Sequence, residues 1–309
     1  MLSEADHRVE RNVRQRSIMF TVAGIGELLW DVLPTEEKLG GAPINFAYHA
    51  AALGAEGIPI SSIGNDTRGN KALDFLAAKH LDTRCISISD DLPTGFVTIE
   101  LDNAGVARYH FPDHVAWDQL TINQASQSVA DRLHAVCFGT LAQRSASSRT
   151  TITRYLHTLP AETKRVVDLN LRQDFYSRDI IETSLELCSI LKLNDDELAT
   201  LAPMFGLSGS IPEQLHSLLR EHHLELVIMT RGADGSILLS ERELSDHPGT
   251  ATTVVDTIGA GDSFTAAVTI GLLLQRPLDE INETASRLAA YVCSQSGAMP
   301  DIPETYSYR

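Results

Sequence analysis

Two glycines and an aspartate lie directly in front of an apolar, helix-like segment near the carboxyl end of the chain. Gly259 and Gly261 flank Ala260, and Asp262 follows before the run SFTAAVTIGLLL. Because glycines leave backbone N–H groups uncovered at the start of a helix, this segment can bind an anion such as a phosphate group. The positive end of the helix dipole favours the ionised form of Asp262. A carboxylate beside an anion can abstract a proton, although a simple helix cap would have the same local sequence.

A second glycine turn, near the amino end, has the composition of a site for a neutral polyol. Gly40, Gly41, an Ala-Pro pair and Asn45 precede a predicted small-residue helix. The turn can approach a ligand closely, and the Asn45 amide offers both a donor and an acceptor. The GIG segment further upstream could suggest a dinucleotide site, but Leu29 occupies the third glycine position and argues against that interpretation.

Apolar, β-branched runs alternate with helical patterns along most of the chain. The runs that we predict as strands cover residues 18–25, 58–63, 135–138, 165–169, 190–193 and 226–230. Repetition of strand and helix implies right-handed crossovers and a sheet that is covered on both faces. The predicted fold is therefore α/β, with a doubly wound, mostly parallel sheet and helices on both faces.

Two segments interrupt this alternation, at residues 28–39 and 95–111. The second one, GFVTIELDNAGVARYHF, alternates around a turn at residues 102–105 and predicts a β-hairpin. A hairpin does not join a parallel core easily, so we expect a small β sheet that projects over one edge and serves as a lid.

The predicted domain organisation is a single domain over residues 18–309, in which the two interrupting segments form the lid. Residues 1–17 are rich in charge and almost without apolar periodicity, which predicts a disordered or loosely held extension. Met19 is an alternative to Met1 as the start of the protein.

Composition and charge argue against several classes of protein. With 41 acidic and 25 basic residues, the formal net charge of -16 opposes binding to nucleic acids and to anionic membranes. The apolar runs fall short of the ~20 residues that span a bilayer, and the first residues lack the apolar core of a secretory signal. Cys85, Cys137, Cys188 and Cys293 are far apart, which indicates buried, reduced thiols. We therefore expect a cytoplasmic protein.

The string DTIGAGDSF at residues 256–264 resembles the carboxyl-terminal signature of the ribokinase-like (PfkB) carbohydrate kinase family. GGAPIN at residues 40–45 is similar to the family's amino-terminal signature, and the two motifs occur in the family's order. The resemblance implies an ATP-dependent sugar kinase with Asp262 as its general base. Gly259, Ala260 and Gly261 would then supply the amides that hold the γ-phosphate during transfer.

The resemblance also assigns residues to the sugar. Asp31 takes the place of an acidic residue with which family members bind two sugar hydroxyls, although an aspartate in a surface turn would look the same. The residues expected to bind the substrate are Asp31, Gly40, Gly41, Asn45, Phe96, Arg108, His110 and Arg172.

A nucleotide site and two cation sites are implied in the same way. KLNDDE contains the N-x-x-E spacing through which the family organises Mg2+ by way of water, and TRGADGS is similar to its nucleotide-binding loop. On their own, these segments would be an acidic helix start and a hairpin turn. The residues assigned to ATP are Asn194, Thr230, Gly232, Gly235 and Cys293. Those assigned to Mg2+ are Asn194 and Glu197, and those assigned to K+ are Asp256 and the backbone carbonyls near Gly297.

The segments GELLWD, GGAPINFAYH, HFPDHVAWD and FGTLAQRS look most like those of bacterial fructokinases, and the resemblance spans roughly residues 20–303. It implies that fructose is converted to fructose 6-phosphate. Family members that act on ribose, 2-keto-3-deoxygluconate or nucleosides share the same catalytic features, and a non-catalytic sugar- or nucleotide-sensing relative is a further alternative. The expected partners are therefore a sugar and ATP, and a homodimer through the lid is compatible with the exposed hairpin.

Overall fold

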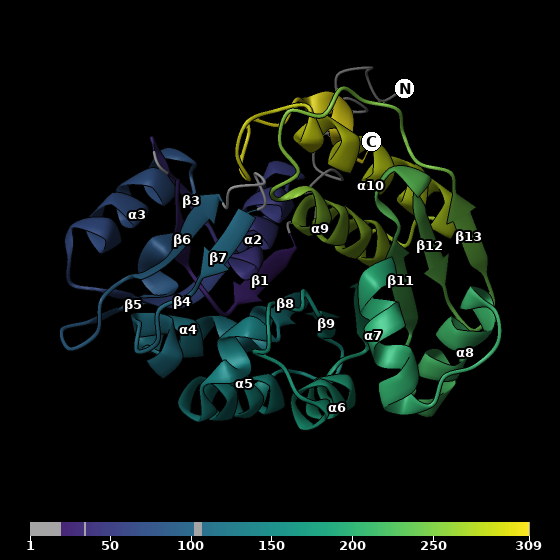
Figure 1. Ribbon diagram of the computed structural model, residues 1–309, viewed down its shortest axis with the longest axis horizontal. Helices are drawn as coiled ribbons and strands as arrows, with labels where there is room; N and C mark the ends of the chain where they lie inside the picture. The colour runs from purple at the N-terminus through teal and green to yellow at the C-terminus, as the bar shows by residue number, and fades with distance from the viewer. Residues whose placement is uncertain (1–19, 34, 102–106, 309) are drawn as a thin grey trace, which may run out of the picture.

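The computed structural model describes residues 20–33, 35–101 and 107–308, so the predicted extension at residues 1–17 and the predicted turn at residues 102–105 lie outside it. The described chain forms a nine-stranded sheet and a separate four-stranded sheet, with helices around them (Figure 1). The strand order in the larger sheet is β13-β12-β11-β10-β9-β8-β1-β4-β5.

The larger sheet is parallel from β5 to β11, and β12 and β13 extend it antiparallel at one edge. Its strands are β1 (Thr21–Ile25), β4 (Glu56–Gly64), β5 (Ile86–Ser89), β8 (Ala135–Gly139), β9 (Lys164–Asp168), β10 (Ile190–Asn194), β11 (Leu226–Thr230), β12 (Ser236–Leu239) and β13 (Leu244–His247). The six predicted strands are confirmed as β1, β4 and β8 to β11. The prediction did not include β5, β12 or β13.

The smaller sheet has the order β3-β2-β6-β7 and unites the two segments that interrupt the alternation. It consists of β2 (Leu29–Val32), β3 (Glu37–Gly40), β6 (Gly95–Leu101) and β7 (Ala107–His110). The predicted antiparallel pairing of β6 with β7 is confirmed. The parallel pairing of β2 with β6, in which Leu29 lies opposite Gly95, has no signal in the local sequence.

Helices cover both faces of the larger sheet, as predicted. Those in the described chain are α2 (Ala42–Ala52), α3 (Thr67–Ala78), α4 (Gln124–Val129), α5 (Ala146–Thr158), α6 (Arg178–Leu187), α7 (Asp195–Phe205), α8 (Ile211–Glu221), α9 (Ala260–Leu273) and α10 (Leu278–Cys293). None of these helices is long and apolar enough to cross a membrane.

Alternation along the strands divides the core into two layers. Val22, Cys137 and Ile228 face one cluster, which contains α2, α9 and α10. Their neighbours along the strands face a second cluster, which contains α5, α6, α7 and α8. Figure 1 shows α9 and α10 on the side of the sheet opposite to α5 and α6. Even-numbered positions of β9 and β10 therefore point toward α9.

The cysteines follow the prediction in part. All four are free thiols, and Cys85 and Cys137 are buried. The expectation of burial is wrong for Cys188 and Cys293, which are only half-buried because they lie near the ends of α6 and α10.

Candidate active site

Gly259 allows α9 to begin with an open first turn. It forms the N-cap of the helix with a φ of 80°, a left-handed conformation that favours glycine. A Cβ atom at this position would lie 2.6 Å from the carbonyl oxygen of Ala298, so a larger residue would also collide with the backbone. The first N–H groups of a helix have no partner within it and attract anions. We call residues 259–262 the anion site.

Asp262 lies half-buried in this first turn and contacts the second glycine motif. Its Oδ2 accepts a hydrogen bond of 2.7 Å from Nδ2 of Asn45 in α2. Burial raises the pKa of Asp262 to about 6, and the nearby Asp168 carboxylate adds to the increase. The Asn45 bond and the charges of Lys192 and Arg172 oppose it. A carboxyl group with a pKa slightly below neutral is suited to act as a general base.

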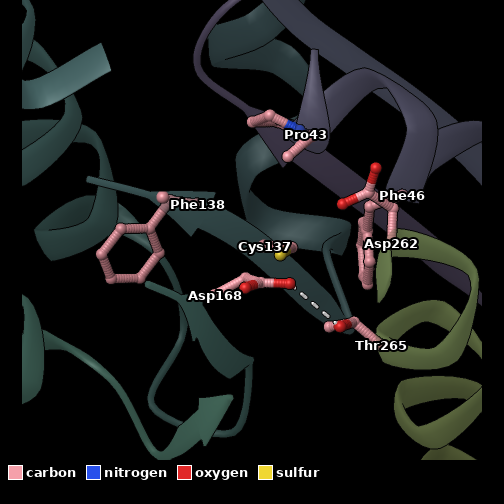
Figure 2. Close-up of a pocket in the computed structure, with 9 residues that line it drawn as sticks. Pro43, Phe46, Cys137, Phe138, Asp168, Asp262 and Thr265 are labelled. Carbon is pink, nitrogen blue, oxygen red and sulfur yellow. Dashed lines mark hydrogen bonds between the residues drawn. The ribbon is translucent and has the colours of Figure 1, made fainter. Parts of the chain in front are cut away.

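A buried ion pair lies beside the anion site. Lys192 on β10 and Asp168 on β9 both point toward α9, and Nζ of Lys192 lies 3.0 Å from Oδ1 of Asp168. Thr265 of α9 donates a hydrogen bond of 3.1 Å to the other oxygen of Asp168 (Figure 2). A Cβ atom at Gly261 would lie 3.4 Å from Nζ of Lys192, so this positive charge lies against the anion site.

Neither Asp168 nor Lys192 is among the site residues that were predicted from the sequence. The signal that could have identified them is a charged residue beside the apolar residues of two neighbouring strands, Lys192 within ILKLN and Asp168 after the two valines of KRVVD, because a charge buried in such a strand needs a partner.

Glu27 is a third buried carboxyl group that sequence analysis did not assign. Its side chain is 2% exposed, and Oε2 has no hydrogen-bond partner in the part of the chain that the structure describes. Burial raises the pKa of Glu27 to about 7; the charge of Asp262 raises it further, and that of Arg172 lowers it. Glu27 therefore belongs to the electrostatic environment of Asp262.

Figure 2 shows a small cavity beside Asp262, between α2, β8 and α9. Pro43, Phe46, Phe138 and Asp168 are among the residues that line it with Asp262, and its volume is about 10 Å³. This space corresponds to about one water molecule. The cavity is too small for a sugar, which must bind on another side of Asp262.

The residues predicted to bind the sugar separate into two groups. Asp31, on β2, has a pKa raised to about 6 by burial and opposed chiefly by the charge of Arg172. Arg172 also acts on the pKa of Asp262, to which Asn45 is hydrogen-bonded. Asn45 thus contacts Asp262 directly, and the charge of the exposed Arg172 acts on both Asp31 and Asp262.

The two predicted glycines support this group. A Cβ atom at Gly40 would lie 3.0 Å from Oδ2 of Asp31, and one at Gly41 would lie 2.3 Å from the carbonyl oxygen of Glu27. Gly41 also has a φ of 115°. Gly41 is therefore required for the close approach of α2 to the backbone of Glu27, whereas a side chain at Gly40 would meet only the movable carboxylate of Asp31.

Phe96 and His110, two of the residues predicted from the hairpin, do not join this group. Phe96 lies under the guanidinium group of Arg68, at 4.5 Å, and packs against the cluster around α2 and α3. His110 is exposed at the end of β7, and the side chain of Arg108 lies outside the described part of the structure. Gln173 donates a hydrogen bond to the carbonyl group of Tyr109, which connects the hairpin to the segment that carries Arg172.

A larger cavity, of about 650 Å³, lies on the other side of the anion site. Ala260 and Gly261 line it, and its volume is in the range of small-molecule binding sites. Four of the residues predicted to bind ATP line the same cavity: Thr230, Gly232, Gly235 and Cys293. The structure thus joins residues from β11, α9 and the end of α10 in one space next to Asp262.

Asn194 and Glu197 form a reciprocal cap at the start of α7. Oδ1 of Asn194 accepts the N–H of Glu197, and Oε2 of Glu197 accepts the N–H of Asn194, both at 2.8 Å. Oε1 of Glu197 accepts the N–H of Leu171, also at 2.8 Å. Because both carboxylate oxygens already accept hydrogen bonds, Glu197 fits the predicted action on Mg2+ through water and does not fit direct coordination. In the described chain, no group of three His, Cys, Asp or Glu side chains could hold a metal ion.

The contacts of Asp256 do not fit the predicted K+ ligands. Oδ2 of Asp256 accepts hydrogen bonds from Nζ of Lys38, at 3.2 Å, and from the N–H of Gly297, at 3.0 Å. Oδ1 accepts the N–H of Ile258, at 3.1 Å. Gly297 therefore presents a donor to this carboxylate, and Lys38 already supplies a positive charge.

Comparison with known proteins agrees with this geometry. Residues 20–305 match the model of the pfkB family of carbohydrate kinases, which covers nearly the whole chain. The chain belongs to the pfkB family. It is an ATP-dependent sugar kinase with the ribokinase-like α/β fold, which confirms the family resemblance, the fold class and the use of ATP.

Three relatives show how the pfkB kinase compares with individual proteins. It is 28% identical over 297 residues to an uncharacterized sugar kinase of Pyrococcus horikoshii, covering 90% of this chain and 91% of that one. The crystal structure of that protein in complex with ATP gives a TM-score of 0.78, over 90% of this chain and 94% of that one. Identity to the fructokinase of Klebsiella pneumoniae is 27%, over 90% and 95% of the two chains. The chain is also 27% identical to the ribokinase of Mus musculus, in an alignment that covers 85% of this chain and 81% of that one.

Proposed function

We propose that this pfkB kinase phosphorylates fructose at its primary hydroxyl and forms fructose 6-phosphate. The similarity to the Klebsiella pneumoniae fructokinase supports fructose as the substrate. The observation that carries the catalytic proposal is the position of Asp262. Its half-buried carboxylate is hydrogen-bonded to Asn45 on one side and adjoins, through Gly261, the 650 Å³ cavity on the other.

In the proposed reaction, Asp262 accepts the proton of the primary hydroxyl as the hydroxyl oxygen attacks the γ-phosphorus of ATP. The bond from the γ-phosphorus to the bridging oxygen breaks, and ADP leaves with that oxygen. The N–H groups of the anion site stabilise the charge on the transferred phosphoryl group. The Lys192 ammonium, next to Gly261, adds to the positive potential there.

The remaining residues bind and orient the two substrates. Asp31 would accept hydrogen bonds from sugar hydroxyls. Asn45 and Arg172 would supply further polar contacts to the sugar beside Asp262. The 650 Å³ cavity would hold ATP, with its phosphates toward Gly261. Mg2+ neutralises charge on the ATP phosphates when bound, and Glu197 would act on it through water.

The small sheet β3-β2-β6-β7 is proposed to act as a lid over the sugar. This role accords with the position of Asp31 on β2. A homodimer through this sheet and a cytoplasmic location rest on the sequence alone.

Purified protein with ATP and Mg2+ tests the substrate against a panel that contains fructose, ribose, 2-keto-3-deoxygluconate and nucleosides. Fructose should give the highest kcat/KM, with fructose 6-phosphate as the product. Turnover of another acceptor without turnover of fructose would refute fructose while leaving the kinase mechanism in place. The ribokinase from Mus musculus, equal in identity to the Klebsiella pneumoniae enzyme, makes ribose the strongest alternative.

Asp262→Asn tests the mechanism because it retains the shape of the side chain and removes the base. We expect kcat to fall by about 10²- to 10⁴-fold, with the affinity for ATP largely retained. Asp196→Asn is the matched control, since Asp196 also lies in the first turn of a helix, α7, and is exposed. An Asp262→Asn enzyme with wild-type kcat would exclude Asp262 as the base.

A further inference from the structure

Lys38 extends from the small sheet to the loop that leads into the anion site. It lies on β3, two residues before Gly40, and its Nζ lies 3.2 Å from Oδ2 of Asp256. It also donates a hydrogen bond of 3.2 Å to Oγ of Ser296, and Oε1 of Glu36 lies 3.4 Å away. Oxygen atoms from three separate segments therefore surround this ammonium group.

The ion pair is largely shielded from solvent. The side chains of Lys38 and Asp256 are 21% and 15% exposed. A lysine at this position gives up rotamer freedom to hold one geometry, so its contacts with oxygen atoms must compensate for that loss. Partial burial also strengthens the attraction relative to a pair in open water.

Asp256 connects this ammonium group to the anion site through the backbone. Its Oδ1 accepts the N–H of Ile258, which is followed directly by the N-cap Gly259. Its Oδ2 accepts the N–H of Gly297, and the neighbouring Ala298 lies against Gly259. The Asp256 carboxylate is thus hydrogen-bonded to both backbone segments next to Gly259, the one at Ile258 and the one at Gly297.

An unpaired carboxylate at this position would disfavour a phosphate. Asp256 is hydrogen-bonded to the N–H of Ile258, the residue before Gly259, so its negative charge lies close to the amides that must attract the γ-phosphate. The carboxylate and the phosphate would therefore repel each other. A cation at Asp256 removes that repulsion and keeps the carboxylate in its two backbone hydrogen bonds. The resemblance to the family implies K+ at Asp256, but here Nζ of Lys38 already lies 3.2 Å from this carboxylate.

We propose that the Lys38 ammonium group takes the place of a bound monovalent cation at Asp256, so that this kinase does not require K+. Lys38 is a positioning residue, since it acts on the anion site through Asp256. Because Lys38 and Asp31 belong to the same small sheet, the ion pair also links the sugar side of the site to the phosphate side. This inference rests on the proposed kinase mechanism.

The test compares the turnover of the full-length protein in buffers that contain K+, NH4+ or tetramethylammonium as the monovalent cation. Wild-type kcat should be the same in all three. Lys38→Met retains the length of the side chain and removes the charge. The kcat of Lys38→Met should fall by about 10- to 100-fold in tetramethylammonium, because loss of the charge at Asp256 displaces the anion site. K+ or NH4+ should restore most of that loss by occupying the vacated position.

Lys79→Met is the matched control. Lys79 lines the same surface region as Lys38, but its partner Asp301 is 95% exposed, so we expect no change in kcat in any buffer. Circular dichroism and the ATP affinity of Lys38→Met show whether the variant is folded. The wild-type comparison needs no variant and tests the proposal by itself.

Three results would overturn the proposal. The first is a wild-type enzyme that needs K+, and the second is a Lys38→Met enzyme that is fully active in tetramethylammonium. The third is a folded Lys38→Met enzyme whose loss neither K+ nor NH4+ restores, since Lys38 would then do more than supply charge. Wild-type protein that is inactive in every buffer with every sugar would instead refute the proposed function.

Discussion

Replacement of Glu27 by Gln should stabilise the protein above neutral pH and have little such effect in acid. Burial raises the pKa of Glu27 from an ordinary value of 4.5 to about 7. As the pH rises between these values, the unfolded chain loses a proton that the native protein keeps. The contribution of Glu27 to stability is therefore complete below pH 4.5 and is lost as the pH rises through about 7.

The pKa difference sets the size of the effect. The increase from 4.5 to about 7 corresponds to about 3 kcal/mol of unfolding free energy, at about 1.4 kcal/mol for each pKa unit. Gln has nearly the shape of the protonated acid but does not ionise. The free energy of unfolding of Glu27→Gln, minus that of the wild type, should thus be larger at pH 8 than in acid by about 3 kcal/mol.

Urea unfolding of both proteins at pH 4.5 and pH 8 measures this change. Comparing the two pH values cancels any constant cost of packing an amide in place of an acid. Glu241→Gln, at an exposed position, controls for the loss of one negative charge from a chain with a net charge of -16. If Glu27→Gln differs from the wild type by the same amount at both pH values, the carboxyl group is ionised in the native protein and the reasoning fails.

Three further predictions concern the anion site and its support. The pKa of Asp262 is raised to about 6, so kcat/KM for the sugar should fall about tenfold for each pH unit below that value; a flat profile in acid would contradict its role as the base. Lys192→Met leaves the buried Asp168 carboxylate without its ion-pair partner, so the free energy of unfolding, measured with urea, should fall by about 3–5 kcal/mol. A decrease below about 1 kcal/mol would show that solvent reaches the ion pair. Gly259→Ala should lower kcat more than Gly54→Ala. Both glycines have a left-handed φ, of 80° at Gly259 and 96° at Gly54, but only at Gly259 would an added Cβ atom collide with the backbone. Equal losses of activity in the two variants would contradict this steric argument.

Much of the fold could be predicted from local pattern. The six predicted strands appear as β1, β4 and β8 to β11, because a run of β-branched residues favours a buried strand whatever surrounds it. The helices α2 and α9 also begin directly after Gly41 and Gly259, as the two glycine motifs indicate. These features depend on neighbours within a few residues along the chain, which the sequence displays directly.

The shared small sheet could not be predicted in this way. The segments at residues 28–39 and 95–111 are each recognisable as interruptions, yet nothing in either one indicates that β2 pairs parallel with β6. Strand pairing depends on partners that the chain brings together only when it folds. The same limit explains why Phe96 and His110 were assigned to a site that the structure does not place them in.

The candidate active site depends both on the local sequence and on the tertiary structure. The sequence by itself determined that Asp262 begins a helix behind glycines, because that requires only short-range geometry. Tertiary structure decided which charges act on it. Lys192 pairs with Asp168 across 24 residues, and Lys38 pairs with Asp256 across 218. Electrostatic attraction and desolvation depend on distances in space of a few ångströms and on burial, and the order of residues along the chain specifies neither.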